Sequence, residues 1–132
     1  MSIRRRIDQT EGRAALARWE QARRTSAEEV ERATLAMAVR YTLEELAARH
    51  AGGTVEVRIP PFGVTQCIAG PKHTRGTPPN VIETDPHTWL RLAVGELSFA
   101  EARAADPAIA SGTRADLSQQ LPLFTAAELA GS

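Results

Sequence analysis

The sequence contains a single cysteine, a single lysine and no excess of charge of either sign. Cys67 is the only cysteine, which excludes an intramolecular disulfide and a metal cluster held by cysteines. The sixteen Lys and Arg residues balance the sixteen Asp and Glu residues. The chain therefore lacks the positive footprint of a protein that binds nucleic acid, and we expect no nucleic-acid partner. The run from Arg4 to Arg6 is interpreted as a solvated N-terminus.

Long apolar runs are also missing. No stretch reaches the roughly 20 apolar residues that a bilayer-spanning helix needs, and the first residues lack the apolar core of a signal peptide. These absences predict a cytoplasmic protein that does not span a membrane. The 132 residues are enough for one hydrophobic core and too few for two ordinary domains. Residues 1–132 are therefore expected to form a single domain.

Residues 1–50 are predicted to form two helices. In the first, Leu16 and Trp19 belong to an apolar stripe at helical spacing. Ser26 and Glu29 have the spacing of a capping box, which predicts that the second helix begins near Ala27. The apolar residues of this second helix form two adjacent stripes, so it is expected to pack against more than one neighbour.

The spacing of apolar residues changes from helical to alternating at residue 54. Residues 54–59 alternate apolar and charged side chains, which predicts a half-buried strand. Its core face is expected to carry Val55, Val57 and Ile59, and its other face Glu56 and Arg58. Two prolines, a phenylalanine and a glycine follow, and they predict a tight turn into a second strand at residues 64–69. We expect a β-hairpin.

The C-terminal half contains several helix-start signals. Asp85 before Pro86 predicts the start of a helix, and Ser98 with Glu101 predicts the start of a second, shorter one. Residues 80–84 and 108–111 are expected to be short strands. A final helix is predicted from residue 113 onward, carrying Leu117 and Leu121. The tail at 124–132 is expected to be a loosely held terminal turn.

The stretch at 83–123 is similar to the C-terminal half of sterol carrier protein type-2 domains. In those domains a strand is followed by a helix with a central apolar pair, a glycine, a short helix, a strand and a Leu-rich helix. Here Trp89, Leu90, Gly95 and Leu117 take corresponding places. The segment VEVRIPPFGVTQCIAGPKHTRGTPPNVIETD more specifically resembles small actinobacterial orthologues of that family, and this narrower resemblance extends over residues 41–123.

The resemblance implies an α+β fold, with one twisted, mostly antiparallel sheet of four or five strands covered by helices. In well-studied relatives it also implies an apolar tunnel for sterols, fatty acids or acyl thioesters. The general family has no set of catalytic residues that could be transferred. The resemblance therefore implies a binding protein rather than an enzyme.

The loop at 72–77 is the most polar candidate for ligand contact. Lys72, His73 and Arg75 stand among threonines and a glycine, and cations with hydroxyl groups can hold a carboxylate or phosphate. The competing interpretation is a solvated loop made rigid by its prolines. Likewise, Trp89 is interpreted both as a core residue and as a wall of the tunnel that the resemblance implies.

Residue types that carry chemistry are otherwise sparse. Cys67 lies within a predicted strand, where a thiol packs as a small apolar side chain. The histidines His50, His73 and His87 include no pair four residues apart, which is the spacing of ligands in a helical metal site. No nucleophile elbow occurs. We expect no metal, no cofactor and no catalytic residues.

Three functions remain open at this point. The leading one is a non-catalytic carrier of an apolar small molecule or lipid, possessing an anionic head that faces the loop at 72–77. The runner-up is a solidly packed interaction module, including a homodimer through the helix at 27–49. The third is a small enzyme or enzyme subunit that acts on an acyl thioester. The ligand-binding residues expected for the carrier are Val57, Ile68, His73, Arg75, Thr77, Trp89 and Leu92.

Overall fold

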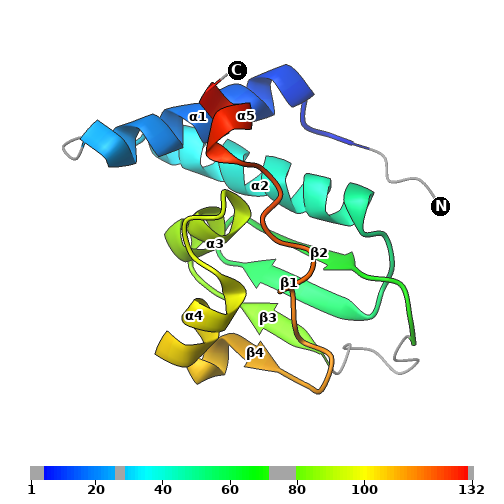
Figure 1. The fold of residues 1–132 in the computed structure, drawn as a ribbon. Helices are drawn as coiled ribbons and strands as arrows, with labels where there is room; N and C mark the ends of the chain where they lie inside the picture. The colour runs from blue at the N-terminus through cyan, green and yellow to red at the C-terminus, as the bar shows by residue number, and fades with distance from the viewer. Residues whose placement is uncertain (1–4, 26–28, 72–79, 131–132) are drawn as a thin grey trace.

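Helices and strands follow one another as Figure 1 shows, in a computed structural model that describes residues 5–25, 29–71 and 80–130. In chain order the elements are α1 (Gln9–Thr25), α2 (Arg32–Arg49), β1 (Val55–Ile59), β2 (Gly63–Cys67), β3 (Val81–Glu83), α3 (Pro86–Ala93), α4 (Phe99–Ala105), the 3₁₀ turn η1 (Pro107–Ile109), β4 (Ala110–Ser111) and α5 (Ala126–Ala130). The α+β fold class is confirmed. No helix within these ranges has the length and apolar character to cross a bilayer.

The four strands form one sheet in the order β2-β1-β3-β4. β1 pairs with β2 and β3 pairs with β4 in antiparallel fashion, whereas β1 and β3 are parallel. The predicted hairpin is present, with Val55 opposite Cys67 and Ile59 opposite Gly63. The sheet is therefore mixed but mostly antiparallel, as expected.

The alternation along β1 places its two sets of side chains on opposite faces of the sheet. Val55, Val57 and Ile59 are fully buried against the helices, while Glu56 and Arg58 are half-buried on the other face. On that outer face Arg58 donates to Glu56 at 2.5 Å. The face assignment made from the sequence is confirmed.

α1 covers one of the two apolar stripes of α2. The two helices run side by side above the sheet (Figure 1), and Leu16 and Trp19 of α1 are buried in the same core as Val39 and Tyr41 of α2. Gly12 permits the close approach, because a Cβ there would collide with the Tyr41 ring. The chain itself thus supplies the second neighbour that the two-striped helix requires.

α2 begins at Arg32, five residues later than predicted. Its N-cap, Glu31, has extended backbone angles and makes no side-chain capping bond; Ser26 lies outside the described residues. Because α1 ends at Thr25 and α2 returns along it, a helix from Ala27 would leave a single residue for the reversal. Helix–helix connections commonly use two to eight residues, so the chain reversal takes precedence over the local capping pattern.

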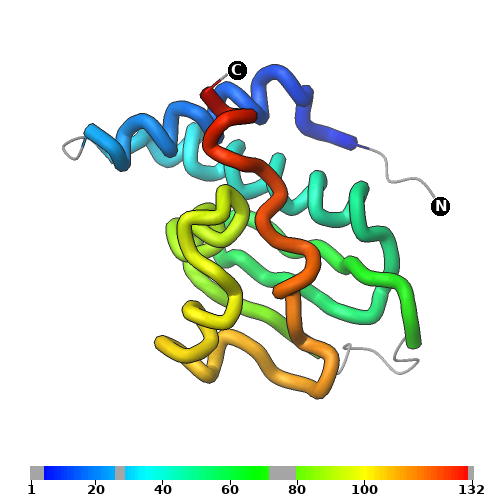
Figure 2. The backbone as a smooth tube through the Cα atoms, viewed as in Figure 1, coloured from blue at the N-terminus to red at the C-terminus, as the bar shows by residue number. Residues whose placement is uncertain are grey.

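The predicted helix after residue 113 is wrong. Asp116 accepts a hydrogen bond from the Ser118 amide at 2.7 Å, which closes a turn instead of capping a helix. The chain then runs across the molecule to α5 (Figure 2), and the Leu123 and Phe124 amides both donate to the Ala93 carbonyl. An extended segment spans this distance with fewer residues than a helix would need.

The expected loose tail is also corrected over residues 126–130, where α5 forms. Leu129 is buried, and the Arg13 guanidinium on α1 donates to the Glu128 carbonyl at 3.0 Å. The C-terminal helix is therefore held against α1, and the two helices lie next to each other in Figure 1.

Candidate functional site

The structure places the four described members of the predicted ligand-binding set in, or packed against, one hydrophobic core. Val57 on β1 and Trp89 and Leu92 on α3 are fully buried, and Ile68 is half-buried just after β2. His73, Arg75 and Thr77 lie outside the described residues, together with the rest of the loop at 72–79. The described members thus include three core positions and one strand end.

Trp89 has its polar atom satisfied inside the protein. The indole Nε1 donates to Thr42 Oγ1 at 2.8 Å, and that hydroxyl donates in turn to the Ala38 carbonyl at 2.8 Å. α3 is held in place for this contact by Asp85, whose carboxylate accepts from the Thr88 amide at 3.1 Å. Buried polar groups are normally paired in this way, so Trp89 has the contacts of a core residue.

Ile68 adopts a backbone conformation that is costly for its side chain. Its φ is 70°, in the left-handed region where a β-branched residue is an outlier. Its amide donates to the His50 carbonyl at 2.6 Å, and its carbonyl accepts from the Thr54 amide at 3.1 Å. Gly52 packs directly against that carbonyl and has no space for a Cβ.

Thr54 holds both flanks of the segment at 72–79. Its hydroxyl donates to the Pro71 carbonyl at 3.1 Å, and its carbonyl accepts from Asn80 Nδ2 at 3.1 Å. Asn80 also accepts from the Arg114 amide at 2.9 Å. Thr54 and Asn80 are both buried. The residues that flank the loop predicted to bind the ligand head group are therefore hydrogen-bonded to the same buried threonine.

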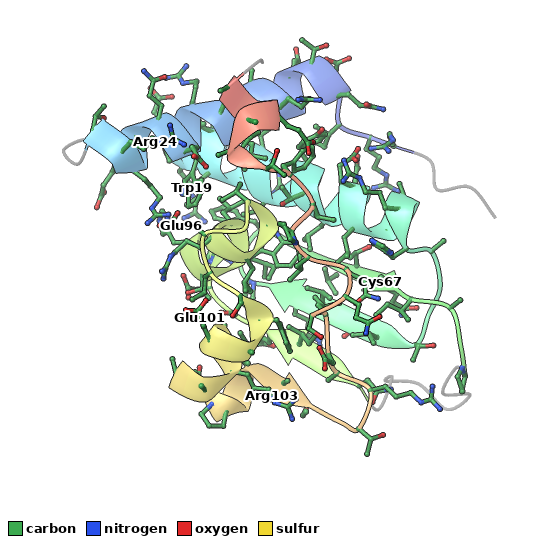
Figure 3. The ribbon with its side chains drawn as sticks, in the orientation of Figure 1. Trp19, Arg24, Cys67, Glu96, Glu101 and Arg103 are labelled. Carbon is green, nitrogen blue, oxygen red and sulfur yellow. The ribbon has the colours of Figure 1, made fainter. Side chains whose placement is uncertain are left out.

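Cys67 lies buried at the end of β2 (Figure 3), where burial raises the pKa of its thiol to about 12. A protonated, inaccessible thiol is a poor nucleophile and a poor metal ligand. Among the described side chains, no three of His, Cys, Asp or Glu are grouped as metal ligands would be.

The surface hollows that have the size of small-molecule sites include four of about 330 to 490 Å³, and none of the four is lined by Val57, Ile68, Trp89 or Leu92. The first, which we call the α1–α3 cleft, has a volume of about 450 Å³. Its lining residues are Glu20, Arg23, Arg24, Val94, Gly95, Glu96 and Ala126. Figure 3 shows Arg24 and Trp19 on α1 beside Glu96 in the turn after α3.

The cations of the α1–α3 cleft already have anionic partners. Arg23 donates to both carboxylate oxygens of Glu96 and lies over the Trp19 ring, with its Cζ 4.9 Å from the ring centroid. Arg24 pairs with Glu20 at 2.7 Å. A ligand anion would have to displace a carboxylate of the protein, so this cleft is better suited to fastening α1 than to binding.

The second hollow, which we call the β2 groove, is more apolar. It has a volume of about 370 Å³ and lies between α2, the start of β2 and the N-terminal segment. Its lining residues are Arg6, Ile7, Arg40, Leu43, Glu44, Phe62, Gly63, Val64 and Thr65. Its apolar side chains on the helix side are Ile7, Leu43 and Phe62, and Val64, which is 60% exposed, borders the groove from the outer face of the sheet, opposite Arg58.

Among the residues that the structure describes, the guanidinium groups of the β2 groove have no carboxylate partner. Arg40 donates from Nε to the Phe62 carbonyl at 3.0 Å, which holds its guanidinium at the groove. Arg32 lies over the Phe62 ring, with its Cζ 5.0 Å from the ring centroid. Within the described ranges, no ion pair is formed by Arg6, Arg32 or Arg40.

Glu44, the one acid of the β2 groove, is directed at backbone amides. Its carboxylate accepts from the amides of Arg6 and Ile7 at 3.0 to 3.1 Å. This bond fixes the N-terminal segment as the far wall of the groove. The nearby cations therefore keep their charge available to an external anion.

The sequence interpretation did not identify this groove. Its residues come from three segments that are far apart in the chain. Gly63 lets β2 approach α2 closely, because an added Cβ there would lie 3.1 Å from the Leu43 side chain. The available signal was Arg40, the one charged residue of α2 between Arg32 and Glu44. A single residue of that kind does not predict a site.

A family model described as bacterial SCP ortholog matches residues 31–123, more than half of the chain. The chain belongs to this family. A search of curated proteins found no match. The region matched to the bacterial SCP orthologues runs from the start of α2 to the segment before α5. It includes the α2 floor and β2 wall of the groove, whereas α1, α5 and the N-terminal segment lie outside it.

Proposed function

We propose that this bacterial SCP orthologue is a non-catalytic binding protein that carries an apolar small molecule with one anionic end. The observation that carries the proposal is the β2 groove, where an apolar lining occurs together with arginine side chains that form no ion pair within the described ranges. Membership of a sterol carrier protein-like family supports the apolar nature of the cargo.

The apolar lining suits the tail of such a ligand. Ile7, Leu43, Phe62 and Val64 line a hollow of about 370 Å³, and small-molecule sites begin at roughly 300 Å³. Val64 is largely exposed without a ligand. Covering an exposed valine side chain contributes about 1.5 kcal/mol or more, so a hydrocarbon tail gains where it extends from the groove over the edge of β2 onto Val64.

The arginines suit the anionic end. Arg40 keeps both terminal guanidinium nitrogens for a carboxylate, because its bond to Phe62 uses Nε. A hydrogen bond to a charged group contributes about 1.5 to 3 kcal/mol. Arg6, from the opposite wall, adds a second positive charge. A fatty acid or another carboxylate-bearing lipid fits this arrangement better than a neutral sterol does.

A site beside Trp89, with its head at residues 72–77, remains a second proposal within the same function. It needs the core to open, because Val57, Trp89 and Leu92 are fully buried. The β2 groove needs no such opening. The two placements are distinguished by variants at Arg40 and Arg75.

The test is a titration of the purified protein with palmitate, palmitoyl thioester, methyl palmitate and cholesterol. We expect palmitate to bind, and methyl palmitate to bind at least about tenfold more weakly because it lacks the charge. Arg40→Ala should weaken palmitate binding about tenfold and leave methyl palmitate unaffected. Val64→Asp should weaken palmitate binding, because the new carboxylate repels the palmitate carboxylate and the apolar contact is lost.

Arg103→Ala is the matched control, because this exposed arginine of α4 does not line the groove. If Arg75→Ala and not Arg40→Ala weakens binding, the site lies at the loop. Failure of all four compounds to bind below roughly 100 μM would refute the carrier proposal.

A further inference from the structure

β2 leaves one side of the sheet open. In the order β2-β1-β3-β4, β2 pairs with β1 and has no strand on its outer side in the described ranges. The opposite edge, β4, has two residues only. β2 has five residues and is therefore the longer of the two edges available for pairing.

The backbone groups on the open side belong to Val64 and Gln66. On β1, the Glu56 amide and the Arg58 carbonyl point towards β3, where they bond to Asn80 and Thr84. Residues of an antiparallel pair alternate between bonding each other and bonding outward. Gln66 and Val64 lie opposite Glu56 and Arg58, so their amides and carbonyls point away from β1.

This edge carries none of the usual protection against pairing. Exposed edges are commonly guarded by lysine, proline, bulges or inward-facing charges. β2 reads GVTQC, without charge or proline. In the part of the chain that the structure describes, Val64 is the one large apolar residue that is exposed, and it lies on this edge.

Hollows lie on both sides of the same edge. On the outer face of the sheet, a hollow of about 490 Å³ is lined by Glu56, Arg58, Pro60, Pro61, Gly63, Val64 and Glu83. Gly63 and Val64 also line the β2 groove on the helix side. Side chains of an added strand point alternately to the two faces, so each row would have a hollow to enter.

We propose that the open edge of β2 accepts an extended acidic segment of a partner protein as an additional strand. Arg6 and Arg40 lie beside the edge, and their guanidinium groups form no ion pair with any described carboxylate, so they attract acidic side chains on the helix side. A second copy of this chain would bring the same arginines against each other. The inference goes beyond the proposed carrier function, because it rests on the outward backbone groups of Val64 and Gln66.

The test compares Gln66→Pro with Gln66→Ala. Proline removes the outward amide, and edge positions tolerate it because that amide is not used within the sheet; alanine keeps the amide and removes the side chain. The probe is a labelled peptide of alternating valine and glutamate, followed by fluorescence anisotropy. We expect similar binding to the native protein and Gln66→Ala, and binding at least about tenfold weaker to Gln66→Pro.

Two further probes use the native protein, so they remain informative if Gln66→Pro does not fold. A peptide with lysine in place of glutamate should bind at least about tenfold more weakly, and so should the glutamate peptide with alternate backbone nitrogens methylated. Equal binding of the methylated peptide, or undiminished binding by folded Gln66→Pro, would overturn the proposal. Sedimentation showing a dimer of the native protein that Gln66→Pro abolishes would assign the edge to a second copy, and would overturn it too.

Palmitate titration of the same variants separates this inference from the carrier function. Gln66 does not line the β2 groove, so both variants should bind palmitate as the native protein does. If Gln66→Pro loses peptide binding but still binds palmitate, the result supports peptide binding at the edge of β2. Absence of palmitate binding by every protein would refute the carrier proposal and leave the peptide result standing.

Discussion

Replacing Trp89 tests whether the space between sheet and helices is filled. Trp89 and Thr42 are both fully buried, and the indole nitrogen lies 2.8 Å from the hydroxyl oxygen. Trp89→Phe removes this hydrogen bond, which contributes about 1 kcal/mol, and the space left by the missing ring atoms adds about 1 kcal/mol more. We expect a loss of about 2 kcal/mol in the free energy of unfolding.

Thr42→Val completes the test. This substitution keeps the shape of the side chain but leaves the indole N–H of Trp89 buried without an acceptor, at a cost of about 1 to 3 kcal/mol. Because both changes remove the same bond, the double variant should lose less than the sum of the single losses, by about 1 kcal/mol. Thr34→Val, a half-buried threonine in the same helix, should change stability by less than about 0.5 kcal/mol.

The assay is urea denaturation followed by circular dichroism, which does not depend on the tryptophan that is replaced. A tunnel wall at Trp89 would give a different result, because removing ring atoms beside an existing space creates little new cavity. A Trp89→Phe loss below about 0.5 kcal/mol, or strictly additive single losses, would refute the filled-core interpretation.

Three further outcomes follow from buried or capped groups. Val57→Asp should cost roughly 3 kcal/mol or more in a denaturation curve, since it places an unpaired charge in the core; an unchanged curve would contradict the face assignment of β1. The Cys67 thiol should resist a thiol-specific reagent at neutral pH until the protein unfolds, and Cys67→Ser should still fold, because burial raises the thiol pKa to about 12. Burial raises the pKa of Asp85, but hydrogen bonds from Thr88 outweigh it and hold that pKa below its usual value. The stability from this cap is therefore present above the usual aspartate pKa and is lost as pH falls through the lowered one. Asp85→Ala should cost about 1 kcal/mol at neutral pH, and a cost undiminished in strong acid would contradict the sign.

The elements that were predicted correctly are determined by residues close together in the sequence. β1 was identified because its side chains alternate, and α3 and α4 because Asp85 and Ser98 satisfy free backbone amides that follow directly in the chain. The predictions for the start of α2 and for a helix after residue 113 were wrong for one shared reason. There a capping pattern competes with the path of the chain between distant elements, and the pattern itself contains no information about that path.

The β2 groove has the kind of chemistry that the sequence predicted, but it lies at a position that the sequence did not indicate. An apolar surface beside cations was expected, but at Trp89 and the loop at 72–77. In the structure Trp89 bonds Thr42, while Arg40 and Val64 meet at β2 through contacts between residues more than twenty positions apart. Nothing in the local pattern distinguishes an arginine that an acid neutralises, as at Arg24, from one without such a partner, as at Arg40.

The two helices outside the family match change which surface of the domain is available for binding. α2 alone presents two apolar stripes, and its second stripe was the reason to expect a homodimer. α1 covers that stripe, and α5 and the ion pair of Arg23 with Glu96 hold α1 in place. The premise for docking through α2 is thereby removed, whereas no strand in the described ranges pairs with the outer side of β2. A partner and an apolar ligand would meet at the same edge, where each would bury Val64. Their binding should therefore be mutually exclusive, and the apparent Kd of the acidic peptide should keep rising in proportion to the palmitate concentration once that exceeds the Kd of palmitate, without reaching a plateau.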